Sequence, residues 1–288
     1  MAKNQLFVMD PLPSVDPTHD TTYVIMEETE SRGHEVWVCQ SRDLVVGNDS
    51  ARVQAKRVTL EVDGDEHYEY LEESRRDLAD FDLVWMREDP PFDLNYLHAT
   101  YLLDQVPVPV LNDPAGLRNA NEKMFALNFP NHLPATWVGS RIDEAEQFLE
   151  SVGGDGVVKT LEGFGGEQVF RVKLEAPNSR GLLRMLTDGE DTPVMIQEFL
   201  PEVMEQGDRR IIVLGGKPIG GLTRYPTGGD FRSNIHSGGR AGESDVRPVE
   251  ESICEDLKTE LLDRGLYLVG LDLIGDRITE INVTSPTC

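Results

Sequence analysis

The chain has 288 residues, 39% of them hydrophobic, and carries 52 acidic against 27 basic residues, a formal net charge of −25. This length exceeds the usual size of a single core, so we expect two or three substructures around a shared cleft. So negative a surface repels nucleic acid and anionic membranes and excludes them as partners, and a bound polyphosphate would need local cations.

No targeting or membrane segment is predicted. No apolar run approaches the roughly 20 residues of a membrane-spanning helix, and residues 1–10 lack the long apolar region of a signal peptide. Cys39, Cys254 and Cys288 are scattered without a C-x-x-C spacing, which suits a reducing compartment. We therefore predict a cytoplasmic protein.

The first third of the chain alternates short apolar runs with helical stretches, which predicts βαβ units on a mostly parallel sheet. We expect strands at residues 6–9, 36–39 and 83–86, and a helix at 18–32 that Gly33 ends. Further predicted elements are a helix at 94–105, a strand at 108–112, a helix that begins at Asp113-Pro114 and carries Lys123, and a helix at 143–152.

A loop follows the strand at 83–86, because Pro90 and Pro91 forbid both helix and central strand. Ligands of open α/β sheets gather at the carboxyl ends of strands. Arg87 is therefore a candidate anion contact, although a solvated arginine explains it equally well.

Residues 157–172 predict a β-hairpin with a glycine-rich tip. Gly163, Gly165 and Gly166 would let backbone N–H groups approach phosphate oxygens, and Lys159 would add a positive charge. The tip is not a P-loop, since no Gly-Lys-Ser/Thr and helix follow it. A hairpin that needs glycines only to turn is the alternative.

Two further stretches have a functional and a plain interpretation. Residues 195–201 form an apolar strand ending in proline, with carboxylates just beyond, which suits an adenine slot and a ribose contact but is also an ordinary strand and turn. Residues 224–240 form a polar, glycine-rich stretch with three arginines, too long for an ordinary loop. On an acidic protein these arginines favour a lid that closes over an anion, rather than an idle loop.

The most informative pattern is a predicted two-stranded ribbon at residues 268–283. A three-residue turn at 275–277 would place Asp272 opposite Glu280 and Gly270 opposite Asn282. Like charges directly opposite each other cost up to about 1 kcal/mol, so the pair calls for a cation. Oxygen ligands on one face suit Mg²⁺ completed by substrate phosphates. A solvent-facing acidic surface is the alternative.

Several blocks together resemble the bacterial glutathione synthetases of the ATP-grasp superfamily, in order along nearly the whole chain. These blocks are residues 9–11, 86–87, 89–93, 121–123, 207–210 and 279–287. The resemblance implies an α/β and α+β protein, with a Rossmann-like N-terminal domain at 1–122, an ATP-grasp lid subdomain at 123–200 and a C-terminal ATP-grasp subdomain at 201–288. The two ATP-grasp subdomains would clamp ATP between them.

The resemblance also implies a reaction. Glycine would be ligated to γ-glutamylcysteine through an acyl phosphate, giving glutathione, ADP and phosphate, with ATP and Mg²⁺, or Mn²⁺ in its place. The implied assembly is a homo-oligomer. A ligase for a different acid and amine, and a truncated nucleotide-binding homologue without turnover, are the alternatives.

The site residues that the resemblance implies fall into four groups. Lys123 and Lys159 would hold phosphates beside the glycine tip, while Gln197, Glu198 and Leu200 would line adenine with Asp208 near the ribose. Asp272, Glu280 and Asn282 would hold the metal. Arg210, Arg224 and Arg232 would bind substrate carboxylates and the transferring phosphoryl group. Asn234, Gly238 and Gly239 would belong to the closing loop, which runs from Tyr225 to Arg240.

Overall fold

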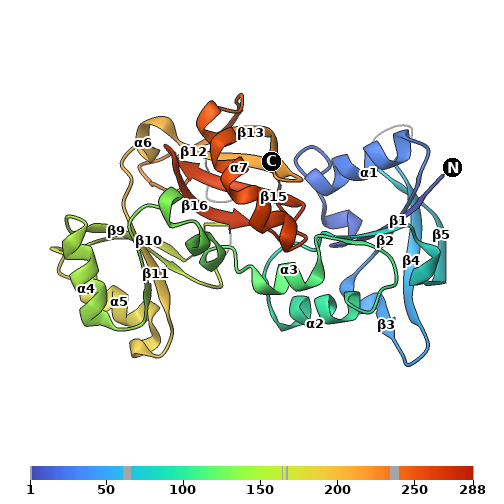
Figure 1. Cartoon of the computed structure of the whole chain (residues 1–288), viewed down its shortest axis with the longest axis horizontal. Coiled ribbons are helices and arrows are strands. Elements are labelled where there is room, and N and C mark those ends of the chain that lie inside the picture. The colour runs from blue at the N-terminus through green and yellow to red at the C-terminus, as the bar shows by residue number, and fades with distance from the viewer. Residues whose placement is uncertain (1, 61–65, 164, 167, 234–239, 288) are drawn as a thin grey trace.

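Three β-sheets form the framework of the protein, with the first at the right of Figure 1, the second at the left and the third between them. The computed structural model describes residues 2–60, 66–163, 165–166, 168–233 and 240–287. No helix within these ranges is both long enough and apolar enough to cross a lipid bilayer.

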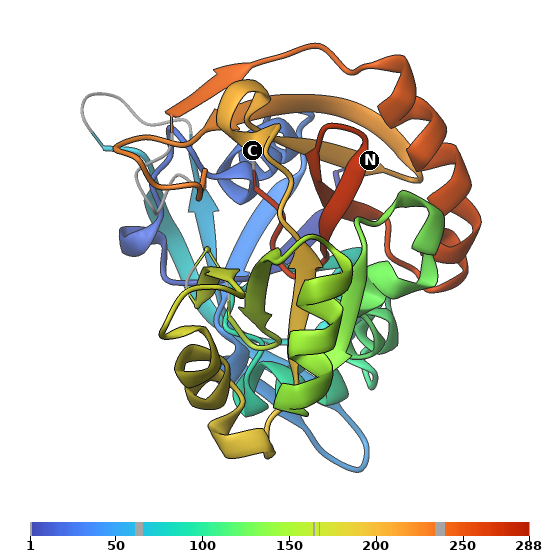
Figure 2. The ribbon, with the colours of Figure 1, turned by 90° about the vertical axis from the view of Figure 1, so that its left-hand side faces the viewer.

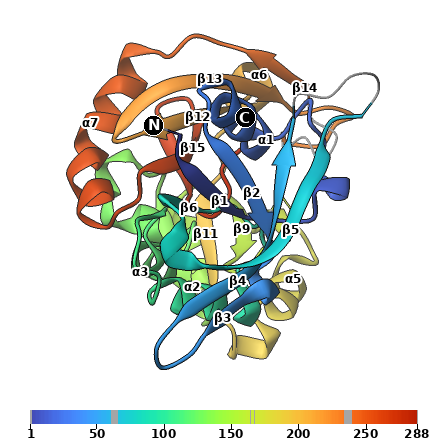
Figure 3. The same cartoon turned by 90° about the vertical axis from the view of Figure 1, so that its right-hand side faces the viewer.

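The first sheet has a parallel centre and an antiparallel flank, which faces the viewer in Figure 3. The parallel strands lie in the order β2 (Glu35–Cys39), β1 (Asn4–Val8), β6 (Leu83–Met86) and β7 (Val110–Leu111). Helices α1 (Thr21–Ser31), α2 (Leu94–Leu103) and α3 (Pro114–Asn119) follow β1, β6 and β7. The antiparallel strands are β3 (Leu44–Val46), β4 (Ala51–Thr59) and β5 (Glu69–Asp77).

The predicted strands at 6–9, 36–39 and 83–86 and the helices at 18–32 and 94–105 are confirmed to within a few residues. The expectation of a mostly parallel sheet is corrected by the flank at residues 44–77, where no helix provides the crossover that parallel pairing requires.

The bounds of two further elements, β7 and α3, also differ from the prediction. The strand expected at 108–112 narrows to Val110–Leu111, because proline at 109 lacks the N–H that a ladder needs. The helix expected to carry Lys123 ends at Asn119. The side chain of Asn121 then accepts the N–H groups of Lys123 and Met124 and starts the 3₁₀ turn η4 (Met124–Asn128).

The second sheet is antiparallel, in the order β10 (Val169–Lys173), β9 (Asp155–Thr160), β11 (Val194–Glu198) and β8 (Thr136–Gly139). Helices α4 (Ile142–Ser151) and α5 (Ser179–Leu186) pack on its outer face, as Figure 2 shows, and α4 confirms the helix predicted at 143–152. Ile142, Leu149 and Leu183 of these helices and Val158 and Ile196 of the sheet are at most 3% exposed. This unit therefore has a core of its own.

The third sheet carries the candidate site. Its strands lie in the order β14 (Arg240–Glu243), β13 (Lys217–Tyr225), β12 (Asp208–Leu214), β15 (Leu268–Ile274) and β16 (Arg277–Asn282), with α7 (Pro248–Asp263) against one face. Strand side chains alternate between faces. Val269, Leu271 and Leu273 face the core, which places Gly270 and Asp272 on the opposite face.

The remaining short elements connect these units. They are α6 (Val203–Gln206) and the 3₁₀ turns η1 (Leu12–Ser14), η2 (Ser41–Asp43), η3 (Leu78–Asp80), η5 (Pro130–His132) and η6 (Asp188–Glu190).

The hydrophobic cores divide the molecule unequally. Side chains of the first sheet, such as Leu6 and Val84, belong to one continuous core with Ile211 and Leu271 of the third sheet and Leu257 of α7. The core of the second sheet is separate. The first and third sheets therefore form one packed body, while the second sheet meets it across the cleft.

Candidate functional site

A cavity of about 770 Å³, counting its open mouth, lies between the second and third sheets. Its lining combines the residues predicted for phosphates, adenine and metal with apolar side chains. The predicted residues that line it are Lys123, Lys159, Gly163, Gly166, Gln197, Glu198, Leu200, Asp208, Arg232, Asp272 and Glu280.

The ribbon of β15 and β16 places Asp272 opposite Glu280 and Gly270 opposite Asn282, as predicted. The turn itself was predicted wrongly. Ile274 pairs with Arg277, so the turn has two residues rather than three, and a bulge at Thr279 restores the register before Glu280. The bulge therefore compensates for the shorter turn and leaves the carboxylates facing each other.

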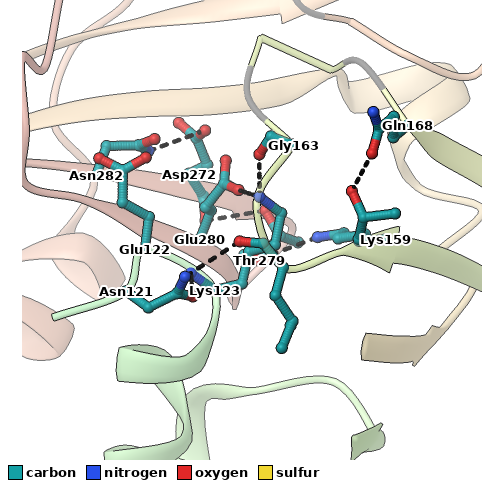
Figure 4. A network of polar contacts seen from close by, with 12 residues as sticks. Asn121, Glu122, Lys123, Lys159, Gly163, Gln168, Asp272, Thr279, Glu280 and Asn282 are labelled. Atoms are coloured by element: carbon teal, nitrogen blue, oxygen red, sulfur yellow. Dashed lines mark hydrogen bonds and ion pairs between the residues drawn. The ribbon is translucent and has the colours of Figure 1, made fainter. Parts of the chain in front are cut away.

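The bulge has a role that the sequence does not reveal. The hydroxyl of Thr279 donates to the main-chain oxygen of Asp272 across the ribbon, at 3.2 Å. The carbonyl of Thr279 accepts from the Nζ atom of Lys159 in the second sheet, at 3.1 Å. A backbone oxygen of the ribbon thus holds a lysine from the opposite wall of the cavity (Figure 4).

Asp272 is only 3% exposed and is paired on both carboxylate oxygens. Arg210 bonds to both of its oxygens, Arg224 approaches Oδ1 at 3.0 Å, and the Asn282 amide donates to Oδ2 at 3.2 Å. Burial by itself would raise the pKa of Asp272, but the two arginines outweigh it and hold that pKa well below the usual range.

Glu280 is paired with a lysine, Lys123, rather than with the arginines that hold Asp272. The Nζ atom of Lys123 lies 3.2 Å from Glu280 Oε1 and also donates to the carbonyl of Gly163 in the glycine tip (Figure 4). Lys123 is 4% exposed. A single lysine from the connecting segment therefore joins the metal-site ribbon to the glycine tip.

Asp208 and Arg224 form a second buried ion pair on neighbouring strands of the same face. Ser233 also donates to Asp208, at 3.2 Å, while Asp208 Oδ1 and Arg224 Nε are buried atoms without a hydrogen-bond partner in the described part of the chain. Burial raises the pKa of Asp208, and the nearby charge of Asp272 raises it further against the opposing effect of Arg224. Its predicted place near a ribose is not tested by these contacts.

Cations and carboxylates are paired around the ribbon. Asp272 pairs with Arg210 and Arg224, Asp208 with Arg224, and Glu280 with Lys123. Burial lowers the pKa of Lys159, and the charge of Glu280 opposes that effect.

The glycine tip and the loop after β13, which contains Arg232, meet at the mouth of the cavity. Gly165 and Gly166 have φ angles of +60° and +81°, which only glycine adopts without strain. Arg232 donates to the carbonyl of Gly166 at 3.3 Å and is held by Asp230 through two hydrogen bonds. The predicted lid arginine therefore does reach the tip.

One part of the lid prediction is wrong, and another concerns residues outside the described ranges. Arg224 is not in the loop, because β13 continues to Tyr225 and buries the Arg224 side chain against Asp208. The predicted loop residues Asn234, Gly238 and Gly239 lie outside the described residues.

Several apolar residues of the cavity were not among the predicted site residues. These are Pro134, Val157, Val169, Val203, Phe231 and Ile274. Phe199, within the stretch 195–201 predicted as an adenine slot, also lines the cavity. The rings of Phe199 and Phe231 pack edge to face, and the Arg171 guanidinium covers Phe199 at 3.4 Å from the ring centre. No local sequence pattern marks Phe231 and Ile274, because only folding brings them to this cavity.

The donor set of the ribbon fits a hard divalent cation. Asp272, Glu280 and Asn282 supply carboxylate and amide groups on one face, and Gly270 opposite Asn282 adds no side chain. In the structure Arg210 engages Asp272 and Lys123 engages Glu280. Binding a metal would therefore exchange these partners rather than fill an uncompensated acidic site.

Arg87, the other candidate anion contact, is turned away from this cavity. It is 3% exposed and donates to the hydroxyl of Thr22 and to the carbonyl of Pro286. Its burial rules out the solvated alternative, and these contacts do not test the anion role. It instead ties the end of β6 to the C-terminal segment.

Comparison with known proteins identifies relatives of the whole chain. The model of the prokaryotic glutathione synthetase N-terminal domain matches residues 4–118, and that of the prokaryotic glutathione synthetase ATP-grasp domain matches residues 122–288. The glutathione synthetase of Parasynechococcus marenigrum is 42% identical, with 98% of this chain and 91% of the relative covered. That of Brucella melitensis is 41% identical, with 100% and 92% covered.

Solved structures show the same fold at low sequence identity. The D-cycloserine synthetase DcsG superposes with a TM-score of 0.69 at 16% identity, covering 98% of this chain and 92% of its own. The ATP-grasp ligase PsnB, in complex with a phosphomimetic variant of its minimal precursor, Mg and ADP, gives a TM-score of 0.60 at 16% identity, covering 99% and 90%. The predicted ATP-grasp fold class is therefore confirmed.

We predict that Asp272→Asn destabilises the ligand-free protein, because Arg210 and the buried Arg224 lose a shared carboxylate. The free energy of unfolding in urea should fall by about 3–5 kcal/mol. Since the folded pKa of Asp272 is depressed, its contribution is complete above about pH 3.9, the ordinary aspartate pKa, and disappears only as the pH falls through the lower folded value.

The matched control is Asp276→Asn in the exposed turn of the same ribbon, whose side chain is 68% exposed. It should change the free energy of unfolding by no more than about 0.5 kcal/mol. Equal effects of the two substitutions would contradict the assigned charge compensation.

Proposed function

This chain belongs to the prokaryotic glutathione synthetase family, and from that premise we propose how its cavity carries out an ATP-dependent ligation. The protein is an ATP-dependent carboxylate–amine ligase that makes glutathione from γ-glutamylcysteine and glycine. The observation that carries the proposed mechanism is the pair of facing carboxylates, buried Asp272 and part-buried Glu280, with cations that reach it from both walls of the cavity.

The chemistry needs an activated acyl group. A carboxylate oxygen of γ-glutamylcysteine attacks the γ-phosphorus of ATP and displaces ADP, and the resulting acyl phosphate is attacked by the amine of glycine. Phosphate leaves with the C–O electron pair, and the amine loses a proton as the amide forms. Positioning and charge neutralisation supply most of the catalysis of phosphoryl transfer, so no side-chain nucleophile is required.

Lys123 and Lys159 are suited to hold the phosphates. Both Nζ atoms lie beside the ribbon at contacts with Glu280 and Thr279, and Gly163 and Gly166 line the cavity next to them. Gln197, Glu198 and Leu200 line the apolar end, which supports the proposed adenine site. Asp208 borders the same cavity, and its ribose contact remains part of the proposal.

ATP-grasp ligases use a divalent metal together with ATP, and a solved relative of this fold holds Mg and ADP. We propose that Asp272, Glu280 and Asn282 hold Mg²⁺, with Mn²⁺ as a substitute. Such a cation neutralises charge on the phosphate oxygens. Arg210 and Lys123 pair with Asp272 and Glu280 in the structure. If these carboxylates held the cation, Arg210 and Lys123 would be available to bind the phosphoryl group or a substrate carboxylate.

Arg210, Arg224 and Arg232 are proposed to stabilise substrate carboxylates and the transferring phosphoryl group. Arg210 and Arg224 rise from neighbouring strands of the third sheet, while Arg232 reaches the glycine tip from the loop after β13. Guanidinium groups bind such anions through paired hydrogen bonds. Closure of this loop would keep water from the acyl phosphate.

The same proposal includes three domains, with limits 1–122, 123–200 and 201–288. It also includes a homo-oligomeric assembly and a cytoplasmic location. The division of the chain into three sheets supports these limits, and the separate core of the second sheet supports the limits of 123–200. Two buried free thiols, Cys39 and Cys254, suit a reducing compartment, since burial raises the pKa of both and keeps them protonated. Size-exclusion chromatography with light scattering tests the assembly.

The test of the function is ADP release measured with each substrate withheld in turn. We expect release to require both γ-glutamylcysteine and glycine for full turnover, and glutathione to appear in equal amount. Release that is unchanged when either substrate is left out would contradict the assignment. A panel of other acids and amines serves as the control for substrate identity.

We predict that Glu280→Gln weakens Mg²⁺ binding and turnover together, because one anionic ligand is lost while the shape is kept. The Mg²⁺ concentration at half-maximal rate should rise at least about tenfold. Glu251→Gln on the exposed side of α7 is the matched control and should behave as wild type. An unaltered Mg²⁺ dependence would remove Glu280 from the metal site.

We predict that Arg232→Ala slows turnover by about 100-fold, the usual cost of losing one donor that stabilises a transition state. Its affinity for Mg·ADP should stay within about threefold, because Lys123 and Lys159 are unaffected. Steady-state kinetics and calorimetric titration separate the two quantities. Arg184→Ala, an exposed arginine of α5, controls for charge, and a defect confined to nucleotide affinity would disprove the lid role.

A further inference from the structure

Glu122 holds the free edge of the ribbon that carries the metal-site residues. β16 is the last strand of the third sheet, so its outer N–H groups have no neighbouring strand. The main-chain oxygen of Glu122 accepts from Ile281 at 2.9 Å, and its carboxylate Oε1 accepts from Val283 at 2.9 Å. One residue thus satisfies two outer amides that flank Asn282.

The same carboxylate oxygen also fixes the chain beyond the strand. It accepts from the backbone N–H of Thr284 at 3.2 Å and from the Thr284 hydroxyl at 2.9 Å. Lys123, the next residue after Glu122, pairs with Glu280. Two consecutive residues of the connecting segment therefore grip β16 on both sides of Asn282, as Figure 4 shows for Glu122, Lys123, Glu280 and Asn282.

The ribbon is anchored at its base by a different residue. The Asn112 side chain donates to the carbonyls of Leu268 and Val283 at 2.7 and 3.0 Å and accepts from the N–H of Leu268 at 2.8 Å. Asn112 thus holds β15 and β16 together where they enter and leave the sheet. The outer N–H groups of Ile281 and Val283 are bonded by Glu122 instead.

We propose that Glu122 is a positioning residue for the metal site, which sets the orientation of Glu280 and Asn282 by bonding the edge of β16 through its carboxylate. The proposal rests on the metal site of the proposed function. Metal ligands must be held within about 0.5 Å of their working geometry, and hydrogen bonds from groups that do not themselves touch the metal usually provide that restraint. Glu122 provides it from the segment between α3 and η4.

Glu122 could act on the ribbon through its hydrogen bonds to β16 or through its negative charge, and two substitutions separate these roles. Removal from solvent raises the pKa of Glu122, and the charge of Glu280 raises it further, so the two carboxylates are close neighbours. A role based on negative charge would be lost in Glu122→Gln and kept in Glu122→Asp. A role based on bonding β16 predicts the reverse, because glutamine keeps an acceptor at the same reach and aspartate is one methylene shorter.

The experiment measures Mn²⁺ binding to the wild-type protein and to Glu122→Gln, Glu122→Asp and Glu122→Ala in the presence of saturating ADP, by electron paramagnetic resonance of free Mn²⁺. We expect Glu122→Gln to bind within about fivefold of wild type, and Glu122→Asp and Glu122→Ala to bind about 10–100-fold more weakly. Amide exchange of Val283 and Thr284 should accelerate in the two weakened variants and stay slow in Glu122→Gln.

The reverse order, with Glu122→Asp close to wild type and Glu122→Gln weakened, would overturn the positioning role in favour of a charge effect. Unchanged Mn²⁺ affinity in Glu122→Asp, with faster exchange at Val283, would also overturn it, because the edge would then be loosened without consequence for the metal. If Glu122→Ala does not fold, the glutamine and aspartate variants still decide the question. Absence of Mn²⁺ binding in the wild-type protein would count against the proposed metal site itself.

Discussion

The structure of the site depends on the compensation of two carboxylates that the ribbon forces to face each other. Asp272 and Glu280 are directly opposite on β15 and β16, and Asp272 is almost fully buried. Such a pair persists only with cations at hydrogen-bonding distance. Those cations come from separate parts of the fold, with Arg210 from the same sheet and Lys123 from the connecting segment.

This compensation also supports the proposal that the cavity binds a polyphosphate. The arginine and lysine side chains that neutralise the ribbon have the chemistry to bind phosphate and carboxylate groups. In the proposed mechanism, these cations would bind the anions once the carboxylates hold the metal. The ion pairs in the structure and the contacts proposed for the reacting complex would then be alternative pairings of the same groups.

These charged groups lie where the second sheet meets the body formed by the first and third sheets. The first and third sheets share one core, while the second sheet has its own and touches the ribbon through Lys159 and Thr279. The apolar end of the cavity likewise draws on Phe199 beside the second sheet and Phe231 from the loop after β13. A ligand in the cavity contacts both bodies, so ligand binding and their relative position are coupled by the same contacts.

The sequence by itself determined much of this protein, because local patterns carry strong physical constraints. The alternation in residues 268–283 established that Asp272, Glu280 and Asn282 share a face, and the glycines at 163–166 marked a tip near Lys159. Only the tertiary structure decided what these residues contact. The burial of Arg224 against Asp208, the contribution of Ile274 to the cavity and the bonds from Glu122 to β16 all depend on elements far apart in the chain. The bulge at Thr279 is local to the ribbon, but no residue pattern marks it. Periodicity reports which way a side chain points, whereas its partner is set by how the sheets pack.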